Sequence, residues 1–321
     1  MSDEVVILKE IGGYFELQRY TGKEYYRDAI ALNRAANCLA YLIKAKGITK
    51  LYIPYFLCRA IKNTCVRCNC DYEYYSIDKT LKSVEDFDLK ENEYFYIVDY
   101  YGQLSKEDVG YYKKKYRSII IDAVQDFFAE PFEQTDTLYS CRKYFGVSDG
   151  AYLYTDALLD EKLETDISYE RMKHILGRYE ETAQKFYNDY TEAEKAFADW
   201  PIKHMSKLTH NLLRGIDYDF VKTRRKENFE YLHSKLKNIN RLELTVPDGA
   251  FMYPLYVENG AELKKKLIAN KIFVPTLWAD VYDVCNEGTL EYDFAKNIVP
   301  LPVDQRYSVE DMKYILEVLH V

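Results

Sequence analysis

The sequence predicts an α/β protein in which a mainly parallel β-sheet lies between helices, followed by a smaller α+β unit. Strand-like and helix-like segments alternate through residues 1–200, which is the pattern of a parallel sheet covered on both faces. Near residue 158 longer helical periodicity begins. The length of 321 residues fits one large and one smaller domain. We therefore expect a large domain over residues 1–200 and a small C-terminal domain over 201–321.

The first helix is expected over residues 34–47, with Asn33 as its N-cap and Gly47 as its stop. A short strand follows over 50–54. The same alternation predicts the remaining elements of this half: helices over 57–69 and 106–116, strands over 72–78 and 93–102, a buried strand within 117–128, and extended segments over 137–146 and 150–156.

The second half is predicted to be richer in helix. Apolar residues recur at helical spacing through 167–197, and a second long helix is expected from Asp219 to about Asn240. Strands over 242–258 and helices over 261–272 and 309–321 would complete the small unit. The residues expected to face inward are Ile175, Leu176, Tyr179, Ala183, Phe186 and Tyr190 in the first long helix, and Phe220, Phe229, Leu232 and Leu236 in the second.

Charge and hydropathy exclude two classes of partner. The net charge is −8 and the basic stretches 111–117 and 221–227 are short and flanked by acids, so we expect no nucleic acid partner. No apolar run approaches the roughly 20 residues that a membrane span requires. The first ten residues are acidic and do not follow the basic-then-apolar pattern of a signal sequence, which favours a cytoplasmic location.

Four of the seven cysteines cluster in the sequence. A structural zinc site normally draws on two separated ligand pairs, and no second pair of cysteines or histidines follows nearby. Free thiols are therefore the favoured interpretation, zinc is the alternative, and we assign no metal. The clustered cysteines are Cys58, Cys65, Cys68 and Cys70.

Polar residues follow two of the predicted strands at the edge where parallel sheets bind ligands. Asp122 ends the apolar run 119–121, and a buried unpaired carboxylate is costly, so it requires a cation or a donor nearby. Gln125 comes three residues later. Ser140 and Lys143 follow at the end of the next extended segment. Taken singly, these residues are typical of a helix cap, a turn and a surface charge.

Together they supply what pyridoxal phosphate (PLP) requires. Lys143 would form the Schiff base with the aldehyde, and Asp122 would keep the pyridine nitrogen protonated. Gln125 would contact the ring, and Ser140 would offer a hydroxyl to the phosphate. The remaining candidates are the helix-start amides of Arg34, Ala35 and Ala36 for the phosphate, Tyr55 or Phe56 as cover for the ring, and Tyr101 as a wall.

The chain resembles the DegT/DnrJ/EryC1/StrS-type aminotransferases, which are PLP-dependent enzymes of fold type I. The resemblance rests on "IIIDAVQDFF", "YSCRKYFGVSDGAYL" and the C-terminal segments "RRKENFEYL", "PTLWADV" and "LPVDQRYSVEDMKYI". It implies a Schiff base on Lys143, a carboxylate partner at Asp122 and a homodimer whose pocket includes the partner's residues 206–215. It also implies amino transfer from an amino acid, expected to be glutamate, to a keto sugar in the synthesis of surface polysaccharides or secondary metabolites.

Some residues depart from the family pattern. The spacing from Ser140 to Lys143 is shorter than usual, residues 148–151 replace a Gly-Glu-Gly-Gly run, and Arg34 stands where small residues are typical. These departures bear on the substrate more than on the cofactor. Two alternatives stay open: another PLP reaction on the same fold, such as elimination or dehydration, and a non-catalytic regulator built on the same scaffold.

Overall fold

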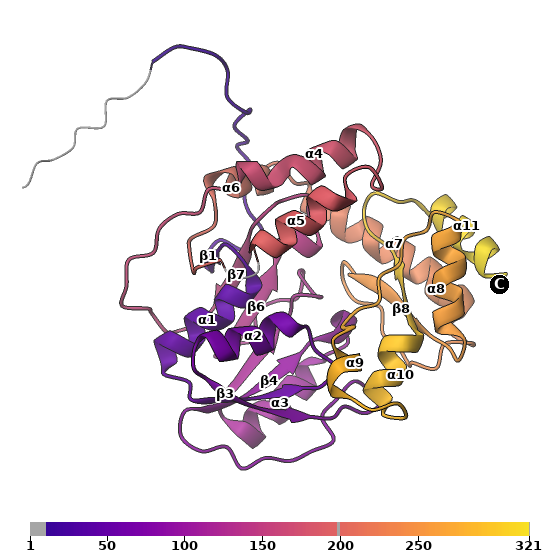
Figure 1. Cartoon of the computed structure of the whole chain (residues 1–321), viewed down its shortest axis with the longest axis horizontal. Helices are drawn as coiled ribbons and strands as arrows, with labels where there is room; N and C mark the ends of the chain where they lie inside the picture. Colours follow the sequence, from indigo (N-terminus) through magenta and orange to yellow (C-terminus); the bar gives the residue numbers. More distant parts are fainter. Residues whose placement is uncertain (1–10, 198–199, 321) are drawn as a thin grey trace, which may run out of the picture.

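The computed structural model describes residues 11–197 and 200–320. A seven-stranded sheet with the order β1-β7-β6-β5-β4-β2-β3 forms its centre (Figure 1). Strands β3, β2, β4, β5 and β6 run parallel, whereas β7 is antiparallel to β6 and β1 is antiparallel to β7. The strands are β1 (Ile30–Leu32), β2 (Lys50–Pro54), β3 (Asp71–Tyr75), β4 (Glu93–Val98), β5 (Ile119–Asp122), β6 (Asp136–Ser140) and β7 (Ala151–Tyr154).

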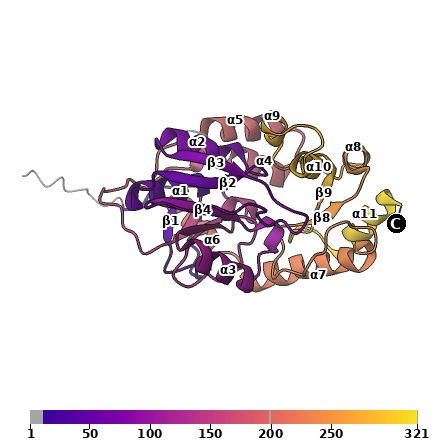
Figure 2. The ribbon, with the colours of Figure 1, turned by 90° about the horizontal axis from the view of Figure 1, so that it is seen from below.

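Helices cover both faces of this sheet, so the predicted mainly parallel α/β architecture is confirmed. Figure 2 shows α2 (Arg59–Arg67) and α3 (Lys106–Tyr116) on opposite faces, and α1 (Ala35–Lys46) packs against α2, β6 and β7. The central strand β5 is buried along its whole length, as expected for a strand between two helical layers. Gly47 ends α1 in the left-handed conformation at φ 60°. Arg34, and not Asn33, occupies the N-cap position.

A second sheet of two antiparallel strands, β8 (Met252–Tyr256) and β9 (Ile298–Pro302), forms the predicted C-terminal α+β unit. It packs with α7 (Tyr218–Leu236), α8 (Gly260–Ala269) and α11 (Val309–Leu319) around a second apolar core that includes Phe229, Leu232 and Leu236. Phe220 was expected to face inward, but it is 49% exposed in the first turn of α7. The shorter helices are α6 (Lys207–Leu213), α9 (Val281–Val284) and α10 (Leu290–Asn297). A domain boundary near residue 200 stays a prediction.

The single helix predicted over 167–197 was wrong. The segment contains a 3₁₀ turn (Tyr169–Met172) and then α4 (Lys173–Glu180) and α5 (Tyr187–Phe197), which pack side by side (Figures 1 and 2). The chain turns back between α4 and α5, and their close packing requires a glycine, because the Phe186 ring lies where a side chain at position 177 would stand. The expected apolar stripe does not face a core: α4 has no buried residue, and Tyr179 is 90% exposed.

None of the helices in the described parts of the chain combines the length and the apolarity needed to cross a lipid bilayer. Residues 1–10, on which the expectation about a signal sequence rests, lie outside the described residues.

Packing of the start of α8 against the end of α10 gives a test of the C-terminal unit. A methyl group at Gly260 would lie 2.0 Å from the Asn297 carbonyl oxygen, whereas one at Gly110 in α3 would have no atom within 4 Å. We expect Gly260→Ala to lower the free energy of unfolding in urea by about 1–3 kcal/mol. The matched control Gly110→Ala should raise it by about 0.5–1 kcal/mol. Equal stability of the Gly260→Ala variant and the wild type would contradict this packing.

Candidate active site

Asp122 lies at the carboxyl end of the central strand β5 and is 4% exposed. Its carboxylate accepts hydrogen bonds from the Tyr96 hydroxyl, at 2.7 Å, and from the Val124 N–H, at 3.1 Å. Burial raises the pKa of Asp122, and the positive charge of Lys143 acts against that rise. Thus the carboxylate predicted from the sequence is fixed in place, and its strongest electrostatic partner is the predicted lysine.

Lys143 ends a short 3₁₀ turn, Cys141–Lys143, that follows β6 directly. Protein surrounds the side chain closely enough for burial to lower its pKa, although Asp122 and Cys58 act in the opposite direction. The residue nevertheless keeps much of its accessible surface. Its Nζ lies 5.5 Å from the centre of the Phe251 ring. The structure therefore brings Lys143 and Asp122 together, as the strand-end argument predicted.

Gln125 holds the turn that follows β4. Its Oε1 accepts the Tyr101 N–H at 3.0 Å, and its carbonyl accepts the Tyr144 hydroxyl at 2.8 Å. Tyr101 adopts a left-handed conformation at φ 57°, in a 3₁₀ turn, Tyr100–Gly102. A non-glycine residue in this region is strained and has to be held by its surroundings. The Tyr101 ring is completely buried, so it forms part of the wall behind the site.

The start of α1 lies next to the loop that carries Lys143. The Asn33 carbonyl accepts the Gly150 N–H at 2.7 Å, which ties the two segments together. The amides of Ala35 and Ala36, in the first turn of the helix, have no intrahelical acceptor. Ser140 ends β6, and its hydroxyl makes no hydrogen bond to the residues that the structure describes. Helix-start amides and a nearby hydroxyl are the groups that bind a phosphate.

The two aromatic residues predicted to cover the cofactor ring, Phe56 and Tyr55, lie in different clusters. Phe56 is 1% exposed and packs on Trp278, with ring centres 4.4 Å apart, while its carbonyl accepts the Tyr100 hydroxyl. Tyr55 lies outside this cluster and stacks on Tyr74 with ring centres 4.7 Å apart. The aromatic side chain found against Lys143 is Phe251, which was not among the predicted residues.

Beside Tyr55 opens a cavity of about 290 Å³ between α2 and α9. Cys58 lines it and also acts on the pKa of Lys143. Arg59 contributes to the lining and pairs with Asp280 at 2.8 Å and with Asp283 at 2.5 Å. The cavity is therefore polar and charged on the side of the C-terminal unit.

Solved structures share this architecture. An aminotransferase of the DegT DnrJ EryC1 StrS type from Brucella abortus is 14% identical, with 91% of this chain and 85% of that chain covered and a TM-score of 0.61. The sugar aminotransferase CalS13 from Micromonospora echinospora is 12% identical, with 91% and 86% covered and a TM-score of 0.62. NtdA from Bacillus subtilis, solved with bound cofactor PMP, is 13% identical, with 92% and 74% covered and a TM-score of 0.62.

The chain has the fold of these aminotransferases. No protein-family model matches its sequence, and no curated protein matches it either. Because one fold hosts many reactions, the chemistry has to be argued from the site residues.

Two residues that support the site in this aminotransferase fold were missed. Arg225 is 2% exposed and donates to the carbonyl of Ala250 at 2.9 Å and to that of Tyr144 at 3.3 Å. It thereby links Ala250, which precedes Phe251, to Tyr144, which follows Lys143. Its burial could have been predicted from the sequence, because Arg225 falls four residues after Val221 and four before Phe229 on the buried stripe of α7. The other missed residue, Tyr96, gave no signal beyond its place in an apolar strand.

Segment 206–215, expected near a partner's pocket, forms α6 and is anchored by its own chain. The Asp149 carboxylate accepts the Ser206 N–H and the Ser206 hydroxyl, both at 2.8 Å, and also the Thr209 hydroxyl. Asp149 is completely buried and belongs to the 148–151 run that departs from the family pattern. The anchoring positions α6 next to the loop that follows Lys143.

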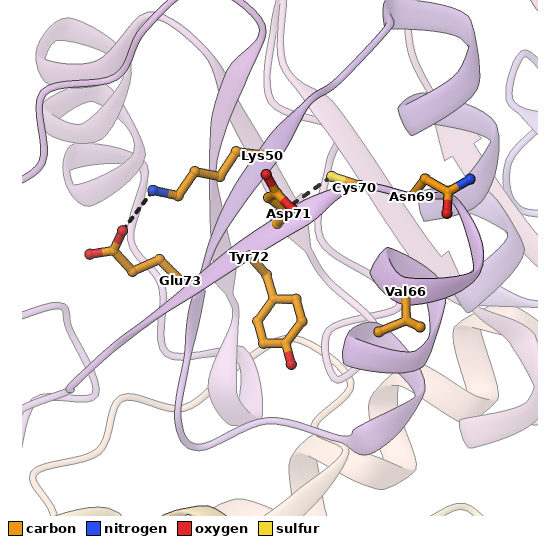
Figure 3. A pocket seen from close by; sticks show the side chains of 7 residues that line it. All are labelled: Lys50, Val66, Asn69, Cys70, Asp71, Tyr72 and Glu73. Atoms are coloured by element: carbon orange, nitrogen blue, oxygen red, sulfur yellow. Dashed lines mark hydrogen bonds and ion pairs between the residues drawn. The ribbon is translucent and has the colours of Figure 1, made fainter.

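A larger hollow lies away from this site, at the edge of the sheet (Figure 3). Its lining includes Lys50 and Asp71, the first residues of β2 and β3, so it lies at the opposite edge from Asp122. Lys50 pairs there with Glu73 at 2.7 Å, and Cys70 faces the same hollow. None of the predicted site residues lines it. Within the described ranges, no three potential metal ligands gather at one point.

Proposed function

We propose that the chain is a PLP-dependent aminotransferase of the DegT/DnrJ/EryC1/StrS family, acting in the cytoplasm on small molecules. The observation that carries this proposal is the electrostatic interaction between Lys143 and the buried carboxylate of Asp122 at the carboxyl edge of an aminotransferase fold. A scaffold without catalytic function has no use for a buried carboxylate beside a lysine whose pKa its surroundings lower, since desolvating such charges is costly.

The residues present fit the cofactor. A pyridine nitrogen requires a carboxylate that is held in place, and the two hydrogen bonds from Tyr96 and Val124 hold Asp122. A phosphate requires donors, which the first turn of α1 and the unengaged hydroxyl of Ser140 offer. The Gln125 side chain is held by the Tyr101 N–H, which its Oε1 accepts at 3.0 Å. NtdA, which has this fold, was solved with bound cofactor PMP.

Each site residue then has a defined role. PLP, when bound, withdraws electrons from the carbon that carries the amino group of the substrate. Lys143 would hold the cofactor through its Nζ, and its free amine would move a proton to and from the substrate carbon. Its lowered pKa raises the fraction of neutral amine available for both tasks. Asp122 would keep the pyridine nitrogen protonated, and the Phe251 ring would lie beside the lysine amine.

We further propose an amino acid, such as glutamate, as donor and a keto sugar as acceptor. CalS13, one of the similar structures, is a sugar aminotransferase, and the charged cavity beside Cys58 suits a polar substrate. A homodimer is part of this proposal. Its support is the apolar surface left exposed on the described chain, which includes Tyr14, Phe15 and Tyr179 at 90% or more.

Amino transfer itself tests the proposal. The protein loaded with PLP should convert L-glutamate to 2-oxoglutarate once per active site, while the cofactor changes to its amine form. Absorption spectroscopy and quantification of the keto acid measure both products. Continuous release of ammonia and pyruvate from L-serine, which carries a leaving group on Cβ, with an unchanged cofactor would instead indicate an elimination enzyme. No reaction with any common L-amino acid, despite bound PLP, would favour a regulator.

A further inference from the structure

Three arginine side chains surround one phenylalanine ring beside the start of α1. The guanidinium carbons of Arg34, Arg142 and Arg171 lie 5.2, 5.1 and 4.6 Å from the centre of the Phe197 ring. Phe197 is 1% exposed and is the last residue of α5. Arg171 has a carboxylate partner of its own, Asp166, at 2.7 Å. The other two arginines belong to segments already placed at the site.

Arg34 is the N-cap of α1, and Arg142 directly precedes Lys143. Burial lowers the pKa of Arg34 to about 10, and the positive charges of Arg142 and Arg67 add to that effect. The two guanidinium groups therefore lie close enough to repel each other. They also lie next to the free amides of the helix start, so the whole region favours an anion.

Two oxygens of α5 occupy this region in the structure. The Glu194 carboxylate pairs with Arg142, and the Phe197 carbonyl accepts a hydrogen bond from Arg34. The Nε of Arg142 is buried and has no hydrogen-bond partner within the described ranges of the chain. When only one nitrogen of an arginine is engaged, its remaining N–H donors are available to a second, bidentate ligand.

The helical pair that carries Glu194 is weakly anchored. Phe197 is the only buried residue of α5, and α4 contributes none. The Lys173–Asp189 ion pair, at 2.6 Å, joins the two helices to each other and not to the body of the molecule. Displacing the end of α5 would therefore expose little apolar surface apart from the Phe197 ring.

We propose that Arg142 and Arg34 bind the phosphate group of the cofactor, and that the Glu194 carboxylate occupies Arg142 until this phosphate displaces it. This inference deepens the proposed function and rests on it. A phosphate monoester offers three oxygens to the two guanidinium groups and the amides of Ala35 and Ala36. It also accounts for Arg34 at a position where small residues are typical of the family.

Equilibrium binding of PLP and of pyridoxal, which lacks the phosphate, tests the inference. Arg142→Gln should weaken PLP binding by about 10-fold to 100-fold, because it removes hydrogen bonds to a charged group. Glu194→Gln should tighten PLP binding several-fold, because it removes the competing carboxylate. Neither change should alter pyridoxal binding. Glu192→Gln, on the exposed side of α5, is the matched control and should change nothing.

The remaining outcomes separate this inference from a folding defect, from a substrate-phosphate site and from failure of the proposed function. A folding defect in Arg142→Gln would weaken PLP and pyridoxal alike, and it would not explain tighter binding by Glu194→Gln. Unchanged PLP binding in both variants would overturn the assignment. If Arg142→Gln spares PLP but weakens inhibition by uridine diphosphate, the arginines serve a substrate phosphate instead. If the wild type takes no PLP at all, the proposed function fails first, which separates the two claims.

Discussion

Replacing Lys143 with alanine should abolish covalent attachment of PLP and lower amino-transfer turnover by roughly 10²–10⁴-fold. The Nζ of this side chain is the amine that lies against Phe251 and interacts with Asp122. Alanine removes both the attachment point and the group that moves the proton, whereas non-covalent contacts to the phosphate and ring remain. PLP should therefore still bind, more weakly, and wash out on dialysis.

The control for this variant is Lys44→Ala, which removes an exposed lysine paired with Glu161 at 3.2 Å. An exposed pair of this kind contributes at most about 1 kcal/mol to stability, so cofactor content and turnover should match the wild type. Partial recovery of Lys143→Ala turnover by added methylamine would locate the defect in the missing amine. Wild-type turnover in Lys143→Ala would remove the lysine from the mechanism.

Replacing Asp122 with asparagine should lower turnover by roughly 10²–10³-fold with little change in fold. Asparagine has the shape of aspartate but cannot balance a positive charge on the pyridine nitrogen. It also removes the charge that raises the pKa of Lys143, so the lysine should titrate at a lower pH in this variant. Steady-state turnover and a pH titration of the cofactor absorbance measure the two effects.

Tyr96→Phe supplies a graded comparison. It keeps the Asp122 carboxylate and removes one hydrogen bond to it, so turnover should fall by about 10-fold only. If Asp122→Asn turns over as fast as the wild type, or if Tyr96→Phe is the more damaged variant, the assigned role of the carboxylate is wrong.

Much of the fold could be predicted from local sequence. The run of three isoleucines before Asp122 identifies a buried parallel strand, and the strand-end rule then places Asp122 near the residues that follow β6. This reasoning needs only neighbours in the chain and the geometry of parallel strands. The roles assigned to Lys143, Asp122 and Gln125 stay predictions until the variants are measured.

Other features depend on contacts that local pattern does not encode. Phe251 reaches Lys143 from more than 100 residues away, and Arg225 holds both segments through backbone carbonyls. Strand β9 was not predicted. It contains Pro300 and Pro302, which a strand tolerates when it is paired on one side only, as β9 is in this two-stranded sheet. The helical character of 167–197 was predicted, but the packing of Phe186 over Gly177 divides the segment, and its apolar stripe does not face a core.

The most direct test of the account is to trap the cofactor with borohydride and map the modified peptide by mass spectrometry. The account predicts a single phosphopyridoxyl group on Lys143. Lys264 is the informative comparison, because it is buried and burial lowers its pKa to about 8, while its Nζ donates to the Ala295 carbonyl at 2.8 Å. Modification of Lys264, or of no lysine in the presence of excess PLP, would contradict the account.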